Sequence, residues 1–205
     1  MRLNTILSTI VSDHDLHAKW LNTLSYMENA GAKKISASEH KEEVTLLILK
    51  HAAEEHRHAY YLKKQLAKLD ENACKTYRNT ELLAPNHTRF YLNTLDVKVC
   101  KYLKQNFQLS GYDLKFAAYL FVTYAIEVRA DELYPIYQQV LTENQSKVTV
   151  KSIILEEEGH LEEMLNQLRE FSPDWEKHAQ AVVKMEEKMF AEWMLALADT
   201  FVPAN

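Results

Sequence analysis

The chain reads HAAEEHRH from residue 51 and EEEGH from residue 156. Each segment contains the pattern Glu-x-x-His, made by Glu55 with His58 and by Glu157 with His160. Residues three apart on an α-helix lie on one face, so each pair can present a carboxylate and an imidazole to one point. One such pair arises easily by chance in a chain with 9 His. Two pairs on two long helices are a more specific sign of a shared metal site.

The surrounding sequence predicts an all-α protein. Its 205 residues include only 3 Gly and 4 Pro, where average usage would give roughly 14 and 10. So few turn formers imply long elements, which argues against a sandwich, a barrel or a doubly wound sheet. Periodicity and capping signals predict six helices, at about 12–29, 39–69, 88–107, 112–141, 147–171 and 172–200. The length predicts one domain over residues 1–205.

Three signals mark breaks between or within these helices. Gly31 and the following KKISAS segment predict a turn. Ser36 with Glu39 predicts a capping box for the second helix, and Ser38 is an alternative N-cap. Pro135 is expected to kink or loosen the fourth helix one turn earlier.

Two further acids, Glu28 and Glu127, lie on the helices that flank the motifs. Glu127 follows YLFVTYAI, an uncharged and mostly apolar run whose face should be buried. An unpaired carboxylate there would cost several kcal/mol or become neutral. The spacings to and between the motifs are 55 − 28 = 27, 127 − 55 = 72 and 157 − 127 = 30 residues. Antiparallel helices joined by short turns separate facing residues by about thirty positions, and the long middle gap leaves room for a crossover helix.

One Glu from each of two helices, with Glu-x-x-His from each of two others, resembles the ferritin-like di-metal carboxylate superfamily. The resemblance covers about residues 12–171, and the short first and last gaps are closer to its oxygenase and oxidase branches. It implies an all-α, ferritin-like four-helix bundle with a crossover helix and an extra C-terminal helix. It also implies two iron ions, with manganese or a mixed Fe/Mn pair as alternatives. The metal ligands that it implies are Glu28, Glu55, His58, Glu127, Glu157 and His160.

Other polar residues are candidates for contacts around the metals. Glu54 and Glu156 each precede a ligand Glu, and in the superfamily an acid there often accepts the imidazole N–H of the opposite motif. His51 and His17 lie on the ligand face and are candidate extra ligands, with ordinary satisfied or surface histidines as the alternative. Asp131 stands where the monooxygenases carry a Thr and is a further candidate.

Several alternatives stay open at this stage. The two motifs could form a solvated charged face, and Glu28 could be a surface acid near a helix end. Glu127 could pair with Arg129, and Glu132 could replace it as a ligand. The aromatic residues of the fourth and sixth helices are expected in the core or in an oligomer contact rather than along a substrate channel.

The expected function is a non-haem di-iron oxidoreductase that activates O2 or peroxide and oxidises a small, unidentified substrate. The chain lacks a rubredoxin-like Cys module, and Leu62 stands where reductase subunits carry their radical Tyr. One alternative is a ferritin-like or rubrerythrin-like protein that handles iron or scavenges peroxide. Another is a helical binding module with a vestigial metal site. The sequence identifies no electron donor, and the apolar last helix allows a homodimer.

Composition narrows the partners and the location. A net charge of −5 and a pI near 6.0 disfavour nucleic-acid binding. No apolar run approaches the roughly 20 residues of a membrane span, and the N-terminal residues do not read as a signal peptide. Cys74 and Cys100 stand alone, which favours reduced thiols over a disulfide. These features predict a cytoplasmic protein without a membrane segment.

Overall fold

The computed structural model describes residues 3–201, and every regular element in that range is a helix. The elements are α1 (Leu3–Ser12), α2 (His14–Ala37), α3 (Leu46–Ala67), a 3-10 turn (Asn79–Glu81), α4 (Pro85–Phe107), α5 (Gly111–Glu143), α6 (Lys151–Phe171) and α7 (Trp175–Asp199). The all-α class is therefore confirmed. The six expected helices correspond to α2–α7, whereas α1 was not predicted.

The largest difference from the sequence analysis lies between α2 and α3. The turn predicted at Gly31 is wrong, because α2 continues through this residue. Burial of Ile35 one turn later offsets the cost of about 1 kcal/mol for a glycine inside a helix. The predicted capping box is also wrong, because the hydroxyls of Ser36 and Ser38 bond back to carbonyls within α2. A loop follows, and α3 begins at Leu46 instead of at residue 39.

The other helix ends differ from expectation by a few residues. α4 begins with Pro85. Proline is tolerated there because the N–H groups of the first helical turn make no hydrogen bond within the helix. α6 begins at Lys151, four residues after the expected start at 147. α5 runs through Pro135 as one continuous helix.

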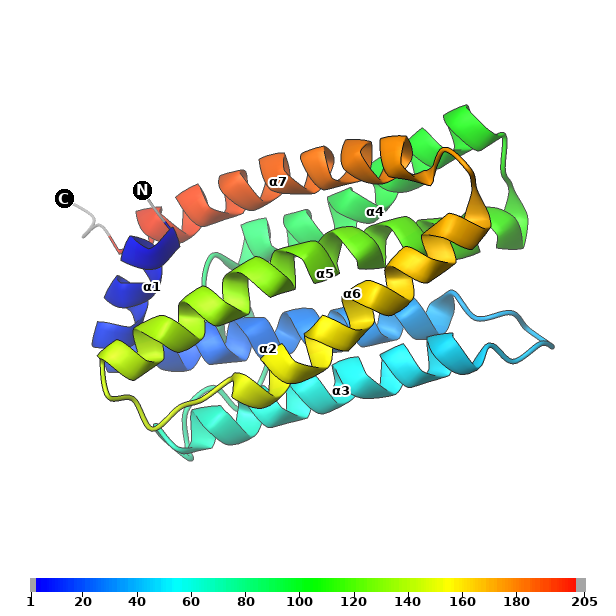
Figure 1. Ribbon diagram of the computed structural model, residues 1–205. Coiled ribbons are helices and arrows are strands. Elements are labelled where there is room, and N and C mark those ends of the chain that lie inside the picture. The colour runs from blue at the N-terminus through cyan, green and yellow to red at the C-terminus, as the bar shows by residue number, and fades with distance from the viewer. Residues whose placement is uncertain (1–2, 202–205) are drawn as a thin grey trace.

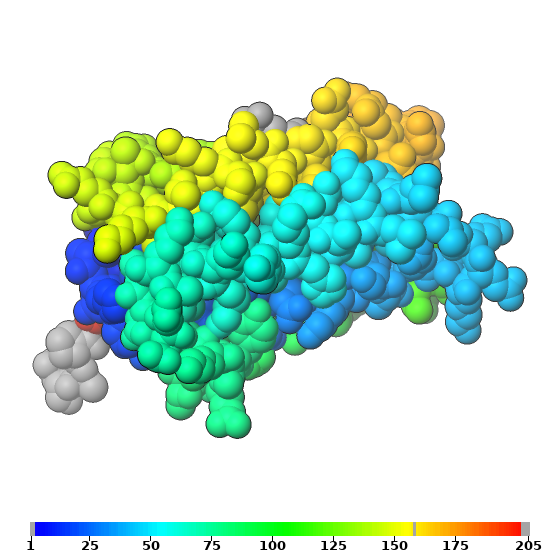
Figure 2. Space-filling view, turned by 90° about the horizontal axis from the view of Figure 1, so that it is seen from below, coloured from blue at the N-terminus to red at the C-terminus, as the bar shows by residue number. Residues whose placement is uncertain are grey.

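The long helices lie lengthwise beside one another (Figure 1). α2 packs along α3, and α5 packs along α6. α4 and α7 pack on each other and on α5, on the side of α5 away from α3. α1 packs across one end of α2 and α5. Seen from below, α3 and α6 lie next to each other on one face of the molecule (Figure 2). The four helices α2, α3, α5 and α6 contain all the residues predicted to bind metal.

One hydrophobic cluster contains buried residues from all seven α-helices. Trp193 of α7 stacks on Trp20 of α2 and on Tyr91 of α4, with ring centroids 5.7 Å apart in both pairs. Glu186 of α7, fully buried, accepts hydrogen bonds from Tyr91 Oη at 2.6 Å and from Arg129 Nη2 of α5 at 2.8 Å. These contacts hold α7 and α4 against α2 and α5. They therefore help to position the two helices that carry Glu28 and Glu127.

Two further expectations concern cysteines and membranes. Cys74 and Cys100 are both free thiols. In the part of the chain that the structure describes, no helix combines the length and the apolar character needed to cross a bilayer.

Candidate metal centre

Six buried or half-buried side chains meet between α2, α3, α5 and α6. Their carboxylate oxygens and ring nitrogens form two groups, and in each group the donor atoms all lie within 4.8 Å of one another. The first group is Glu28, Glu55 and His58, and the second is Glu55, Glu127, Glu157 and His160. All six ligands that the sequence resemblance implies are therefore brought together. Because Glu55 belongs to both groups, the two are adjacent.

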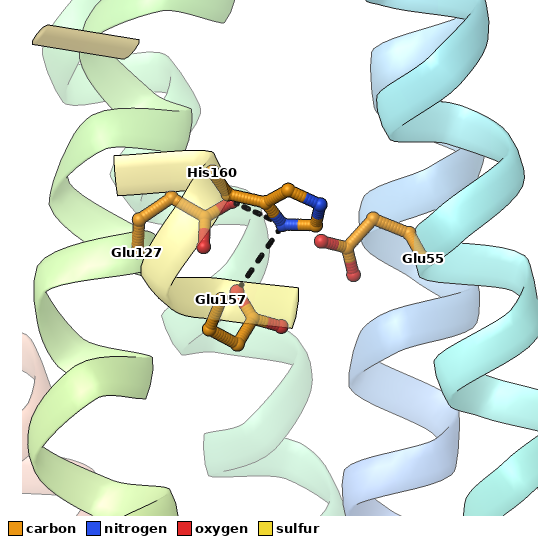
Figure 3. A group of neighbouring side chains, drawn as sticks. All are labelled: Glu55, Glu127, Glu157 and His160. Atoms are coloured by element: carbon orange, nitrogen blue, oxygen red, sulfur yellow. Dashed lines mark ion pairs between the residues drawn. The ribbon is translucent and has the colours of Figure 1, made fainter. Parts of the chain in front are cut away.

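The groups are shielded from solvent. Glu127 is 3% exposed, Glu157 4% and Glu55 7%, and both imidazoles are also buried. Glu28, on α2, is half-buried. Figure 3 shows Glu127 and Glu157 directed at the same ring nitrogen of His160, while Glu55 faces them from α3. A solvated charged face, one of the open alternatives, is therefore wrong.

Each imidazole is oriented by a carboxylate from the opposite helix. His58 Nε2, on α3, donates to Glu156 Oε2 of α6 at 2.8 Å. His160 Nε2, on α6, donates to Glu54 Oε2 of α3 at 2.8 Å. The crossed contacts expected for these two acids are present. With Nε2 carrying the donated proton, Nδ1 is the ring atom turned toward the cluster in both histidines.

The inward-facing atoms lack hydrogen-bond partners. Among the described side chains, Nδ1 of His58, Nδ1 of His160 and Oε2 of Glu157 are buried and unsatisfied. His58 Nδ1 lies 3.1 Å from Glu157 Oε1, and His160 Nδ1 lies 3.4 Å from Glu157 Oε2 and 3.7 Å from Glu127 Oε1. Buried polar atoms are nearly always paired. Two nitrogens and one oxygen that lack partners and face the same point therefore mark a position where a cation could bind.

The cluster is electrostatically strained in the absence of a cation. Burial and the charge of Glu28 raise the pKa of Glu55 well above its ordinary value. Burial and the charge of Glu157 do the same to the pKa of Glu127. Burial also acts to raise the pKa of Glu157, but its interactions with Glu127 and the two imidazoles outweigh burial and lower that pKa. The raised pKa values favour the protonated forms of Glu55 and Glu127, whereas a bound cation would favour their carboxylate forms.

His58 completes this arrangement. Burial acts to lower its pKa, but contacts with Glu157, Glu28 and Glu156 outweigh burial and raise it to about 9. The metal-free imidazole is therefore protonated at neutral pH, with the extra proton on Nδ1 facing Glu157. A cation that binds Nδ1 must displace that proton, so binding is coupled to proton release.

The donor set fits a divalent transition metal. Four carboxylates and two neutral imidazoles carry a charge of about −4, which two divalent ions balance. Oxygen and imidazole donors without thiolates suit iron or manganese and do not suit an iron–sulfur cluster. The buried Glu and His groups could therefore hold metal, and the unpaired inward atoms are the positions that would do so.

His51 is not placed to serve as an extra ligand. It is buried beside His160, with ring centroids 5.0 Å apart. Its Nε2 contacts Glu163 Oε2 at 2.9 Å, and its Nδ1 contacts Tyr119 Oη at 2.9 Å. Both ring nitrogens are therefore occupied, and the alternative of a satisfied core histidine is the one that holds.

His17 and Asp131 also lie outside the two groups. His17 is buried but bonds Tyr137 Oη at 2.8 Å through Nε2. Asp131 lies one turn after Glu127, yet it is exposed together with its neighbour Glu132, so it faces solvent. The residue seven positions after Glu127 is Tyr134, which is buried on the same helix face.

The alternatives for Glu127 are wrong as well. Arg129 bonds Glu186 and Glu132 instead of Glu127. Glu132 is exposed, pairs with Arg129 and belongs to neither group of donor atoms. No basic side chain other than His160 forms an ion pair with Glu127 in the described part of the chain.

The sequence analysis missed two polar residues near the centre. Tyr134 donates a hydrogen bond to Glu28 Oε1. Glu163 holds His51 and also pairs with Lys50. The seven-residue spacing from Glu127 to Tyr134, and from Glu156 to Glu163, is the signal that could have found them, since residues seven apart share a helix face.

A cavity of about 370 Å³ opens onto the cluster. Four of its lining residues are Glu28, Glu55, Glu127 and Glu157, and most of the others are apolar side chains of α2, α4, α5 and α7. This volume lies within the range of small-molecule sites. Tyr119 and Trp193, expected in the core or in an oligomer contact rather than along a channel, also line it.

Comparison of the chain with protein-family models, with curated proteins and with solved structures gave no match.

Proposed function

We propose that the chain is a ferritin-like di-metal protein whose four-helix bundle is formed by α2, α3, α5 and α6. In this proposal α4 is the crossover helix and α7 is the extra C-terminal helix. The antiparallel course of the four helices, each contributing a ligand carboxylate to one buried cluster, supports this assignment.

The two groups of side chains would each hold one ion. Glu28 and His58 would bind the first ion, and Glu127 and His160 the second. Glu55 would help to hold both ions, because it belongs to both groups. Glu157 would also be available to both, because its oxygens lie 3.1 Å from His58 Nδ1 and 3.4 Å from His160 Nδ1. Iron is the proposed metal, with manganese or a mixed pair as the alternatives.

The proposed activity is that of a non-haem di-iron oxidoreductase acting on a small organic molecule. Iron bound here would supply the electrons that reduce O2 or peroxide. The protein would hold the imidazoles through Glu54 and Glu156, exclude water from the buried carboxylates and keep a proton donor, Tyr134, at Glu28. The observation that supports an enzyme over an iron store is the apolar cavity that reaches the carboxylates.

Oxygen uptake by iron-loaded protein tests this function. The protein is loaded with Fe(II) without oxygen, freed of unbound iron and mixed with aerated buffer and a chemical reductant. We expect wild-type protein to consume O2 over many turnovers, Glu55→Gln to consume none above buffer, and Glu162→Gln to match the wild type. Glu162 is an exposed acid on α6 and is the matched control.

The other outcomes separate the remaining classes. Uptake that stops when the bound iron is oxidised would indicate an iron-handling protein, and rapid loss of peroxide without O2 turnover would indicate a scavenger. Failure of wild-type protein to retain iron would refute the proposal.

A further inference from the structure

The cavity beside the cluster is long and follows α5. Its α5 lining begins with Lys115 and ends with Tyr134, with Glu127 between them. On α2 the lining runs from Leu24 to Ala37, and Ser38 follows it. Twelve residues of helix separate Lys115 from Glu127 (127 − 115 = 12), which corresponds to about 18 Å along the axis. Most of the lining residues lie on α2, α4, α5 and α7, and the cavity that they line is called the channel below.

The walls between the two ends are apolar. They include Ile35 of α2, Leu92 and Leu95 of α4, and Ala118, Val122 and Ile126 of α5. Such walls provide no hydrogen bonds, so a molecule between them gains affinity through its own apolar surface.

Charges along the channel are already paired, with one exception. Arg129 is held by Glu186, and Lys34 of α2 pairs with Asp96 of α4. Lys115 is exposed, lines the end of the channel remote from Glu127, and forms no ion pair with any described side chain. The channel therefore has a free cation at its outer end and a group of carboxylates at its inner end.

From this arrangement we infer that the channel binds an unbranched fatty acid, with the carboxylate at Lys115 and the chain lying along α5 toward Glu127. The lining at the inner end is acidic, so an anionic head group gains more beside Lys115 than beside the cluster. An extended chain advances about 1.2 Å per bond, so about 18 Å needs roughly 15 bonds. The matching ligands have roughly 12 to 16 carbon atoms. We also infer that the inner end of the alkyl chain is the part that is oxidised, and this step rests on the proposed function. Binding of the fatty acid does not rest on it.

Calorimetric titration of the metal-free protein with saturated fatty acids tests the inference. Affinity should increase by about fourfold for each added CH2 from octanoate upward, and should level off when the chain fills the channel. The fatty alcohol of equal length should bind more weakly than the acid. A constant affinity across chain lengths would overturn the inference.

Two variants locate the bound molecule. Lys115→Glu should weaken binding of dodecanoate by about 3- to 10-fold, as expected for an exposed ion pair, while Lys188→Glu, an exposed lysine of α7, should leave it unchanged. Val122→Phe, which fills the middle of the channel, should abolish binding of long chains, with far-UV circular dichroism verifying the fold. Binding that neither Lys115→Glu nor Val122→Phe alters would place the ligand elsewhere and refute the proposal.

The test is independent of iron. Fatty-acid binding by a protein that retains no metal would support the channel and refute the di-iron function. O2 turnover by iron-loaded protein that binds no fatty acid would support the di-iron function and refute the fatty-acid channel.

Discussion

Replacing Glu127 with Gln should stabilise the metal-free protein. Glu127 is 3% exposed, and burial with the charge of Glu157 raises its pKa well above the ordinary value. A carboxyl that stays protonated in the fold but ionises when unfolded favours the unfolded state at every pH above its unfolded pKa. The resulting loss in the free energy of unfolding begins near pH 4.3 and grows by about 1.4 kcal/mol per pH unit. It reaches at most about 3.7 kcal/mol at pH 7.

Gln keeps the shape of the protonated acid and can still donate to Glu157. We therefore expect Glu127→Gln to add about 1–3 kcal/mol to the free energy of unfolding at pH 7 without metal, a rise in Tm of roughly 3–10 °C. The gain should almost vanish near pH 4.3, where the folded carboxyl is protonated and the unfolded carboxyl is half protonated. Metal should reverse the order, because an ion at 100 times its Kd adds about 2.7 kcal/mol to wild type and little to the variant.

Thermal melts with a chelator and with excess Mn(II), at pH 7 and near pH 4.3, measure both effects. Glu162→Gln, the exposed control on α6, should change neither. A loss of about 3–5 kcal/mol in metal-free Glu127→Gln is the size expected for breaking a buried ion pair. That result would mean that Glu127 neutralises a cationic side chain, and it would refute the reasoning.

Three further predictions concern the surroundings of the cluster. Glu54→Gln should weaken Mn(II) binding by about 10- to 100-fold relative to Glu162→Gln, measured by titration, because it loosens a ligand imidazole; unchanged affinity would argue against that contact. Because the pKa of His58 is raised to about 9, Mn(II) affinity should fall as pH decreases from 8 to 6, with protons released on binding in weakly buffered solution; affinity that is flat over this range would contradict the assignment. Glu186→Ala leaves the guanidinium of Arg129 buried without its main partner, so denaturant unfolding should show a loss of about 3–5 kcal/mol, and a loss below about 1 kcal/mol would show that the pair does not hold α7.

The six clustered residues could be predicted because each is marked by a strong local rule. The Glu-x-x-His pairs share a helix face at a fixed spacing. Glu127 stands out because it follows the apolar segment YLFVTYAI. Burying an unpaired carboxylate in an apolar core costs free energy, so such a residue needs a partner. Glu28 follows from the spacing of antiparallel helices, and the structure places its carboxylate with Glu55 and His58.

What failed depended on tertiary contacts or on solvent exposure. The end of α2 is set by burial of Ile35, which a turn signal at Gly31 does not reveal. His51 shares the ligand face, yet Tyr119 and Glu163 occupy both of its nitrogens. Asp131 lies one turn after Glu127 but faces solvent, which its spacing alone does not reveal.

The channel could not be read from sequence at all. Its walls come from four helices, and its apolar residues have the same helical spacing as ordinary core residues. Only the three-dimensional packing shows that Lys115 and Glu127 lie along one cavity.

Iron and manganese content per chain, measured by elemental analysis after anaerobic reconstitution and removal of unbound metal, tests the central claim most directly. We predict about two ions per chain in wild-type protein and in Glu162→Gln, with a large loss in His58→Ala and in His160→Ala variants that retain wild-type helicity. Wild-type protein that keeps no transition metal after reconstitution would contradict the account, and the buried carboxylates and imidazoles would then be a protonated polar core.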